Sequence, residues 1–153
     1  MLTKEEAKEL REKFWEGFKK YCSSNNIRRR WLLTGIGIRN TQLKFHADAD
    51  KALVMFQIDH RNDLRRYEIY ESFLPYRKLI TEQTGNELLW DEDFREIGRT
   101  VSAIYFKLPN VSIYNPDEWA KIYAFFVKKM PILEDIYREY RHPVNENIKR
   151  FRS

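Results

Sequence analysis

Apolar residues recur at three- and four-residue steps in three long segments of the chain, which predicts amphipathic helices there. The first segment follows Thr3, and Thr3 and Glu6 have the spacing of a capping box, in which each side chain accepts a hydrogen bond from a free backbone N–H. The polar run at residues 23–26 should end this helix. Its apolar stripe contains Ala7, Leu10, Phe14, Phe18 and Tyr21.

The second helical segment, Asp63–Thr84, contains a proline near its middle. Because Pro75 cannot donate a backbone hydrogen bond, we expect a kink there or a break into two helices. Gly85 stands where a left-handed residue commonly ends a helix.

The third helical segment has the clearest start. Asn115 is a good N-cap residue, and Pro116 suits the first helical position. An apolar stripe then runs from Trp119 to Tyr140, with a second kink expected at Pro131. Beyond His142 and Pro143 we expect a tail or a short final helix.

Two pairs of strands are predicted between the helices. Residues alternate between apolar and polar over Leu43–Ala47, and Ala52–Asp59 is apolar on both faces near its middle. This pattern predicts a hairpin whose second strand lies centrally in the sheet. The second pair is Glu87–Trp90 and Arg99–Leu108, joined by an acidic loop at Asp91–Phe94.

Local hairpins favour an antiparallel sheet with helices on one face. We therefore predict an α+β fold, with four or five strands covered by three main helices in the order α-(β)-ββ-α-ββ-α. The bracketed strand would be a short one at Trp31–Thr34. No linker or repeat is visible, so residues 1–153 are expected to form one domain.

Composition narrows the class of protein. The longest apolar runs are far shorter than a membrane span, and the first residues lack the apolar core of a secretory signal. The single cysteine, Cys22, excludes an internal disulfide and a cysteine-based zinc site, and its place on an apolar helix face favours a packed thiol. We expect a cytoplasmic protein without a membrane partner.

Positive charge is concentrated in two places. Residues 19–30 carry a net charge of +5 and residues 137–153 carry +3, whereas the whole chain carries only +5. Two basic clusters on a mildly acidic body are typical of a nucleic-acid surface, although basic tails also occur without such a partner. The candidate phosphate contacts are Lys19, Lys20, Arg28, Arg29, Arg30, Arg39, Lys149 and Arg150.

Candidate catalytic and metal sites are incomplete. Asp48 and Asp59 lie at the ends of two predicted strands, where a magnesium-dependent nuclease places its carboxylates. The lysine that such sites use is absent. His46, Asp48 and Asp50 lie at a predicted turn, where aspartates commonly bond their own backbone. Gly35 and Gly37 fit a bend better than a phosphate cradle. We therefore assign no catalytic residue, metal or cofactor.

Several short motifs follow one another along the chain: Phe14–Phe18, Trp31, Thr34–Ile38, Ile58–His60, Ser102–Tyr105, Val111–Ile113 and Pro116–Trp119. Their order resembles an uncharacterised bacterial family, a domain of unknown function, over nearly the whole chain. The likeness is greatest to members from Bacteroidetes, and the same domain also occurs C-terminal to restriction-endonuclease-like nuclease domains. The resemblance implies a stand-alone form of a module that is sometimes coupled to DNA-processing enzymes, and it supplies no catalytic residues.

Two functional interpretations remain open at this point. The first is a non-catalytic accessory or binding module that contacts nucleic acid through its basic clusters. The second is a structural module that binds another protein or a second copy of itself. Tyr137 and Tyr140, next to Arg138 and Arg141, suit either base stacking or such a protein interface.

Overall fold

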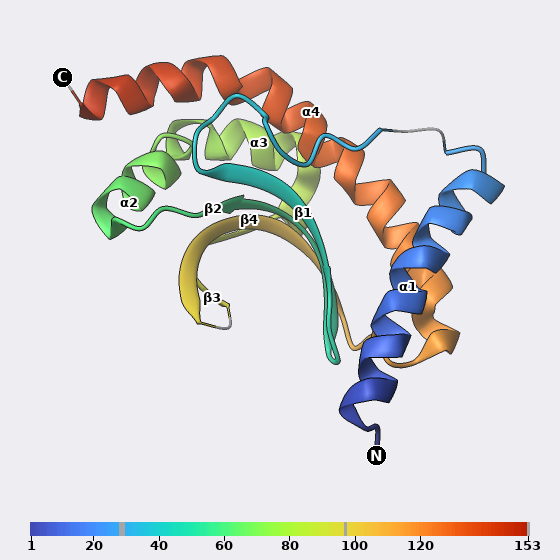
Figure 1. Cartoon of the computed structure of the whole chain (residues 1–153). Helices are drawn as coiled ribbons and strands as arrows, with labels where there is room; N and C mark the ends of the chain where they lie inside the picture. The colour runs from blue at the N-terminus through green and yellow to red at the C-terminus, as the bar shows by residue number, and fades with distance from the viewer. Residues whose placement is uncertain (28–29, 97, 153) are drawn as a thin grey trace.

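The computed structural model describes residues 1–27, 30–96 and 98–152 (Figure 1). Arg28 and Arg29, two of the candidate phosphate contacts, lie outside these ranges. The elements in chain order are α1 (Lys4–Ser24), β1 (Thr41–Ala47), β2 (Lys51–Ile58), α2 (Asp63–Glu71), the 3-10 turn η1 (Leu74–Tyr76), α3 (Arg77–Thr84), η2 (Gly85–Glu87), β3 (Leu89–Glu96), β4 (Arg99–Pro109), η3 (Pro116–Glu118) and α4 (Trp119–Phe151).

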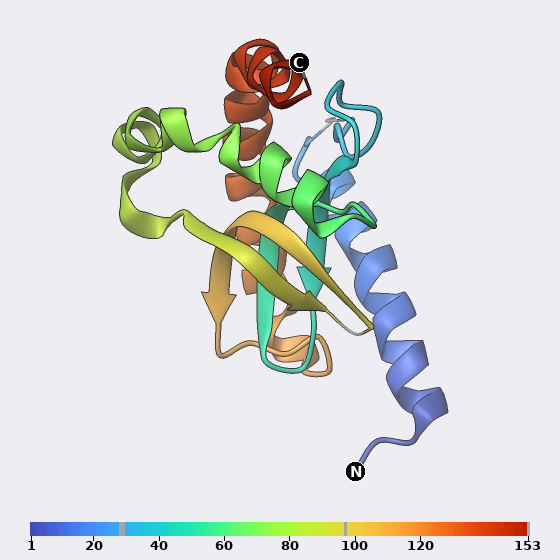
Figure 2. The same cartoon turned by 90° about the vertical axis from the view of Figure 1, so that its left-hand side faces the viewer.

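The four strands form one antiparallel sheet in the order β1-β2-β4-β3. The sheet curves strongly, and the helices lie on its convex side, with α1 beside the edge strand β1 (Figure 1). In the second view α4 passes behind the sheet while α2 and α3 lie above it (Figure 2). The predicted α+β class, strand number and element order are confirmed.

Strand β2 is central and buried on both faces, as its sequence predicts. Val54 and Phe56 point into the main core under the helices. Leu53 and Met55 point to the concave face, where they form a smaller buried cluster with Ala103. The sheet curls enough to bury this second cluster although no helix covers it (Figure 1).

The main core is rich in aromatic rings where α1, α4 and β1 meet. Phe14 and Phe18 of α1 are buried, and both rings pack on Phe126 of α4. Phe45 brings β1 into the same cluster, with its ring centroid 4.8 Å from that of Phe126. These contacts hold α1 against α4 and next to the sheet edge.

The start of α1, the break at Pro75 and the end of α3 agree with the sequence predictions. Thr3 and Glu6 form the capping box. Pro75 lies in η1, which separates α2 from α3, so the segment breaks rather than kinks. Gly85 ends α3 with a positive φ of 74°.

The optional fifth strand is absent, and two further sequence predictions were wrong in detail. Residues 31–34 form no strand, although the Leu43 N–H donates a hydrogen bond to the Leu33 carbonyl (2.9 Å) as a neighbouring strand would allow. The acidic segment Asp91–Phe94 is part of β3 and contains a bulge, rather than forming a loop. The bulge is stabilised from outside the strand, because the Glu92 carbonyl accepts one hydrogen bond from Arg66 and one from the Ser102 hydroxyl.

The second wrong prediction concerns the last helix, which continues through Pro143 to Phe151. Packing and hydrogen bonds hold these final turns. Val144 is fully buried, and the Asn147 side chain donates to the Ser72 carbonyl and to the Tyr76 hydroxyl (both 3.2 Å). No helix within the described ranges is both long and apolar enough to span a membrane.

Candidate functional site

Residues 30–40, which lead into β1, cross the molecule in front of the second half of α4 (Figure 1). We call these residues the α1–β1 connection. Two hydrogen bonds attach it there. The Leu32 N–H donates to the buried carboxylate of Glu134 (2.9 Å), and the Asn145 side chain donates to the Gly37 carbonyl (2.9 Å). Both hydrogen bonds join residues that are more than a hundred positions apart in the sequence. Together they hold the connection against the second half of α4, which carries the C-terminal basic cluster.

Gly37 allows the close approach at the second of these points. Its φ is +94°, and a Cβ there would lie 2.9 Å from the buried hydroxyl of Tyr137. Gly35 also has a positive φ, of 64°, but a Cβ there would meet nothing. The two glycines therefore have a structural role in the bend, as the sequence suggested.

Cations from both basic clusters lie along this junction. Arg138, Arg141 and Lys149 follow Glu134 by 4, 7 and 15 residues. At 3.6 residues per turn all three lie within about 60° of Glu134 around the helix, so they share the face of α4 that meets the connection. All of the cations at the junction are exposed. We call this surface the basic ridge, and define it as Arg30, Arg39, Arg138, Arg141 and Lys149.

Much of the positive charge on the basic ridge is not neutralised. Within the described ranges, no carboxylate forms an ion pair with Arg30, Arg39 or Arg141. Arg138 lies 3.7 Å from Asp135, and Lys149 pairs with a neighbouring glutamate on the same exposed helix surface. Exposed pairs of this kind contribute little and leave the cation free to exchange partners.

Not all of the candidate residues join the ridge. Lys19 and Lys20 lie on the last turns of α1, where Lys19 lines a separate groove. Arg150 points to the other side of α4, where it lines a small hollow next to Pro75. Arg30, Arg39 and Lys149 of the ridge are among the candidates named from the sequence. Arg138 and Arg141 are not, although their helical spacing with Lys149 is visible in the sequence.

The two tyrosines considered as stacking platforms are core residues. Tyr137 and Tyr140 are 1% and 6% exposed. Tyr137 instead lies under a ridge cation, because the Arg141 guanidinium is 5.7 Å from its ring centroid. Neither ring is available for base stacking or for a protein interface, so this part of the sequence interpretation was wrong.

The aspartates considered for a metal or nuclease site are far apart. Asp48 and Asp59 lie at opposite ends of β2, which is eight residues long. The Asp59 carboxylate pairs with Arg99. No cluster of three metal-ligating side chains occurs in the parts of the chain that the structure describes.

Asp48 instead stabilises the β1–β2 turn. It accepts hydrogen bonds from the backbone N–H groups of Asp50 (2.8 Å) and Lys51 (2.9 Å), and it also contacts the side chains of His46 and Lys51. Burial alone would raise the pKa of this carboxyl, but the hydrogen bonds from His46, Asp50 and Lys51 outweigh it and hold the pKa well below its usual range.

Asp48→Asn should therefore lower the free energy of unfolding by about 1–2 kcal/mol at pH 7. Because the pKa is depressed in the folded state, this stability is present above the unfolded pKa of about 3.9 and is lost as the pH falls through the folded value. Urea unfolding of both proteins between pH 2 and 7 should show the difference shrinking below about pH 4. Asp50→Asn is the control, and equal effects of both changes would contradict the assignment.

The concave face carries a polar network above its small apolar cluster. Gln57 is fully buried and bridges Gln42 to Glu96, with its amide donating to the Glu96 carboxylate (2.8 Å). Burial acts to raise the pKa of Glu96, but Arg99 and Lys44 outweigh it and lower that pKa. A carboxylate with a lowered pKa is a weak base, so this network is suited to holding the curved sheet rather than to proton transfer.

Comparison with known proteins places the chain in a family but gives no activity. A search of curated proteins and a search of solved structures found no significant match. The sequence profile of one family matches residues 10–141, which include most of α1, the whole sheet and more than half of α4. The family resemblance seen in the sequence is thereby confirmed, and the chain belongs to the family described as Domain of unknown function (DUF4268).

Proposed function

We propose that this domain is a non-catalytic module that binds the phosphate backbone of nucleic acid through the basic ridge. The observation that carries the proposal is the attachment of the α1–β1 connection to α4, which puts the exposed cations of two distant sequence segments on one surface. Four of the five ridge cations are arginines, whose planar guanidinium groups match phosphate geometry.

The dimensions of the ridge suit a short stretch of duplex. From Arg138 to Lys149 the helix rises roughly 16 Å, at about 1.5 Å per residue. Phosphates along one strand are spaced by about 3.4 Å, so this length corresponds to about five base pairs. The tyrosines of this region are buried and offer no stacking surface. We therefore expect duplex DNA to bind at least as tightly as single strands, with little sequence preference.

Binding of a labelled 20-base-pair duplex at several salt concentrations tests the proposal. Five phosphate contacts give a slope of log affinity against log salt of about −4.5. Replacing Arg30, Arg39 and Arg141 with alanine should reduce the slope to about −1.8, because three contacts are lost. Replacing Lys4, Lys8 and Lys13 on the exposed face of α1 removes the same charge elsewhere and should leave the slope nearly unchanged.

Two glycine variants test whether binding depends on the position of the connection and not only on the charge of the ridge. Gly37→Ala should weaken binding without removing a cation, because the new Cβ collides with Tyr137 and moves the connection off α4. Gly35→Ala meets no atom, and its φ of +64° lies in the left-handed region that other residues can adopt, so it should have a smaller effect. No duplex binding near 150 mM salt, or equal slopes for the two triple variants, would overturn the proposal.

A further inference from the structure

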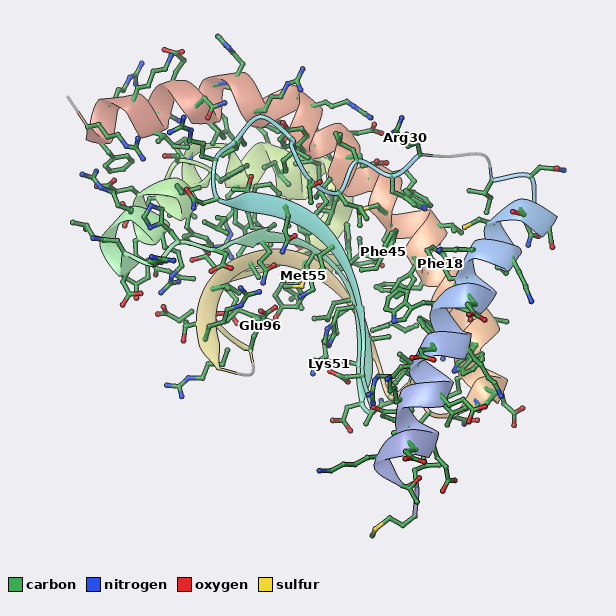
Figure 3. All side chains as sticks on the ribbon, viewed as in Figure 1. Phe18, Arg30, Phe45, Lys51, Met55 and Glu96 are labelled. Atoms are coloured by element: carbon green, nitrogen blue, oxygen red, sulfur yellow. The ribbon has the colours of Figure 1, made fainter. Side chains whose placement is uncertain are left out.

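A groove lies between α1 and the outer edge of β1. Its volume is about 600 Å³. Figure 3 shows Phe18 of α1 and Phe45 of β1 pointing toward one another in the space between the two elements. The groove is lined mainly by Trp15, Phe18, Cys22, Trp31, Leu33 and Phe45.

The apolar lining of the groove is accessible to a ligand. Trp15, Trp31 and Phe45 are each only partly buried. Aromatic side chains gathered in a concavity, with their surfaces partly in water, are typical of a binding site rather than of scattered surface residues. The main core lies directly behind them, since the Trp15 ring stacks on Phe126 at 5.9 Å between centroids. The walls of the groove are therefore held rigidly.

The edge of β1 inside the groove offers unpaired backbone groups. β1 pairs with β2 on one side only. The Leu43 N–H points to the outer side, where it donates to the Leu33 carbonyl. Backbone groups alternate along a strand, so those of Phe45 point to the same side. Among the described residues, no other segment bonds to Phe45 on that side.

The chain's own segments already occupy both ends of this edge. Leu33 bonds at one end, and the Ile113 N–H donates to the Asp48 carbonyl (2.9 Å) just beyond the other end of β1. The open edge between them is about four residues long. A short extended segment fits this gap, and its backbone would continue the ladder.

A second copy of the chain does not fit as well. Its own β1 edge is walled by its own α1 in the same way, so two β1 edges cannot approach each other without moving both helices (Figure 1). The groove therefore suits a single isolated strand. Its rim carries the exposed Lys19, and residues 19–30 include no carboxylate. Lys44 adds no free charge here, because its ammonium pairs with Glu96 on the concave face. Acidic residues in the bound segment would complement this charge.

We propose that the groove binds a short extended peptide of a partner protein, which pairs with the edge of β1 and places a large apolar side chain, flanked by Asp or Glu, among the aromatic rings. This site uses other side chains than the basic ridge, although the α1–β1 connection contributes to both. It gives the domain a second function, the attachment of another protein.

Selection of binding peptides from a phage-displayed library of random decapeptides tests the proposal. The Cys22→Trp variant is used for counter-selection, because its larger side chain fills the groove. Cys22→Ser, which leaves the groove open, is the matched control. We expect enriched peptides that alternate apolar and acidic residues, and that bind the Cys22→Trp variant at least tenfold more weakly than the Cys22→Ser variant. If Cys22→Trp does not fold, Lys19→Glu replaces it and should weaken binding of the acidic peptides by a similar factor.

Two local readouts decide whether a selected peptide occupies the groove. Burial raises the pKa of the Cys22 thiol, so its alkylation is followed at alkaline pH, and the peptide should slow it at least tenfold. The Phe45 amide should exchange with solvent quickly in the free protein and slowly in the complex, whereas the Lys44 amide, which faces β2, should change little. A selection that enriches no peptide, or peptides that leave both readouts unchanged, would overturn the proposal.

Discussion

Phe126→Ala should lower the free energy of unfolding by about 4 kcal/mol. Phe126 is fully buried where α1, α4 and β1 meet. Its ring packs at 4.8 Å from that of Phe45 and at 5.3 Å from that of Phe18, measured between centroids. Truncation removes the transfer free energy of the ring and leaves a cavity among rigid aromatic neighbours that cannot collapse to fill it. Urea unfolding followed by circular dichroism measures the loss.

Phe125→Ala is the matched control for this prediction. Phe125 precedes Phe126 in the same helix but is only partly buried. The same truncation should therefore cost about 1 kcal/mol there, in proportion to the smaller area that is buried. Equal losses at the two positions would show that the junction of α1, α4 and β1 is not the tightly packed centre described above.

The sequence predicted the helices and strands correctly where neighbouring residues alone determine the backbone conformation. The capping box at Thr3 and Glu6 starts α1, and Pro75 breaks the second helical segment into α2 and α3. The alternation in Leu43–Ala47 and the doubly apolar pattern of β2 gave the hairpin and its central strand. In each case the physical cause lies within a few residues of the effect.

The errors arose where distant partners override a local preference. An acidic run favours a loop, but the Arg66 guanidinium binds the bulge at Glu92 and keeps the segment in β3. A proline favours the end of a helix, but Asn147 bonds to Ser72, which follows α2, and to Tyr76 of η1, and so holds α4 together beyond Pro143. These partners are separated by tens of residues, so no local pattern contains them.

The candidate site shows the same limit. The two basic clusters are visible in the sequence. The position of the α1–β1 connection against the second half of α4 is not, because it depends on hydrogen bonds between distant residues, Leu32 with Glu134 and Gly37 with Asn145. The connection also supplies Trp31 and Leu33 to the α1–β1 groove. One irregular segment therefore contributes to both proposed binding surfaces, although its sequence suggested only a passage between helix and sheet.

Arg66→Ala should lower the free energy of unfolding by about 3 kcal/mol, the second large loss that the structure predicts. Arg66 is 1% exposed. It donates hydrogen bonds to the Ser102 hydroxyl (2.8 Å) and to the Asp93 carboxylate (3.0 Å), as well as to the Glu92 carbonyl. Truncation removes these bonds and leaves a cavity the size of a long side chain under α2. Equilibrium unfolding in urea measures the loss.

Two further variants identify the cause of that loss. Arg65→Ala removes the neighbouring guanidinium, which is 40% exposed and pairs with Glu68, and should cost less than about 0.5 kcal/mol. Arg66→Lys keeps the charge but cannot reach several acceptors at once, so its stability should fall between that of Arg66→Ala and the unaltered protein. A loss as small as that of Arg65→Ala would contradict the structural role of Arg66.

The Arg66 contacts also determine the shape of the sheet. They attach α2 to the bulge of the edge strand β3, and β3 carries Phe94, which covers the small cluster on the concave face. Arg66→Ala should therefore speed amide exchange across β3 and the facing part of β4 more than across β1. An equal increase in all strands would mean that Arg66 stabilises the fold as a whole and not the curvature of this edge.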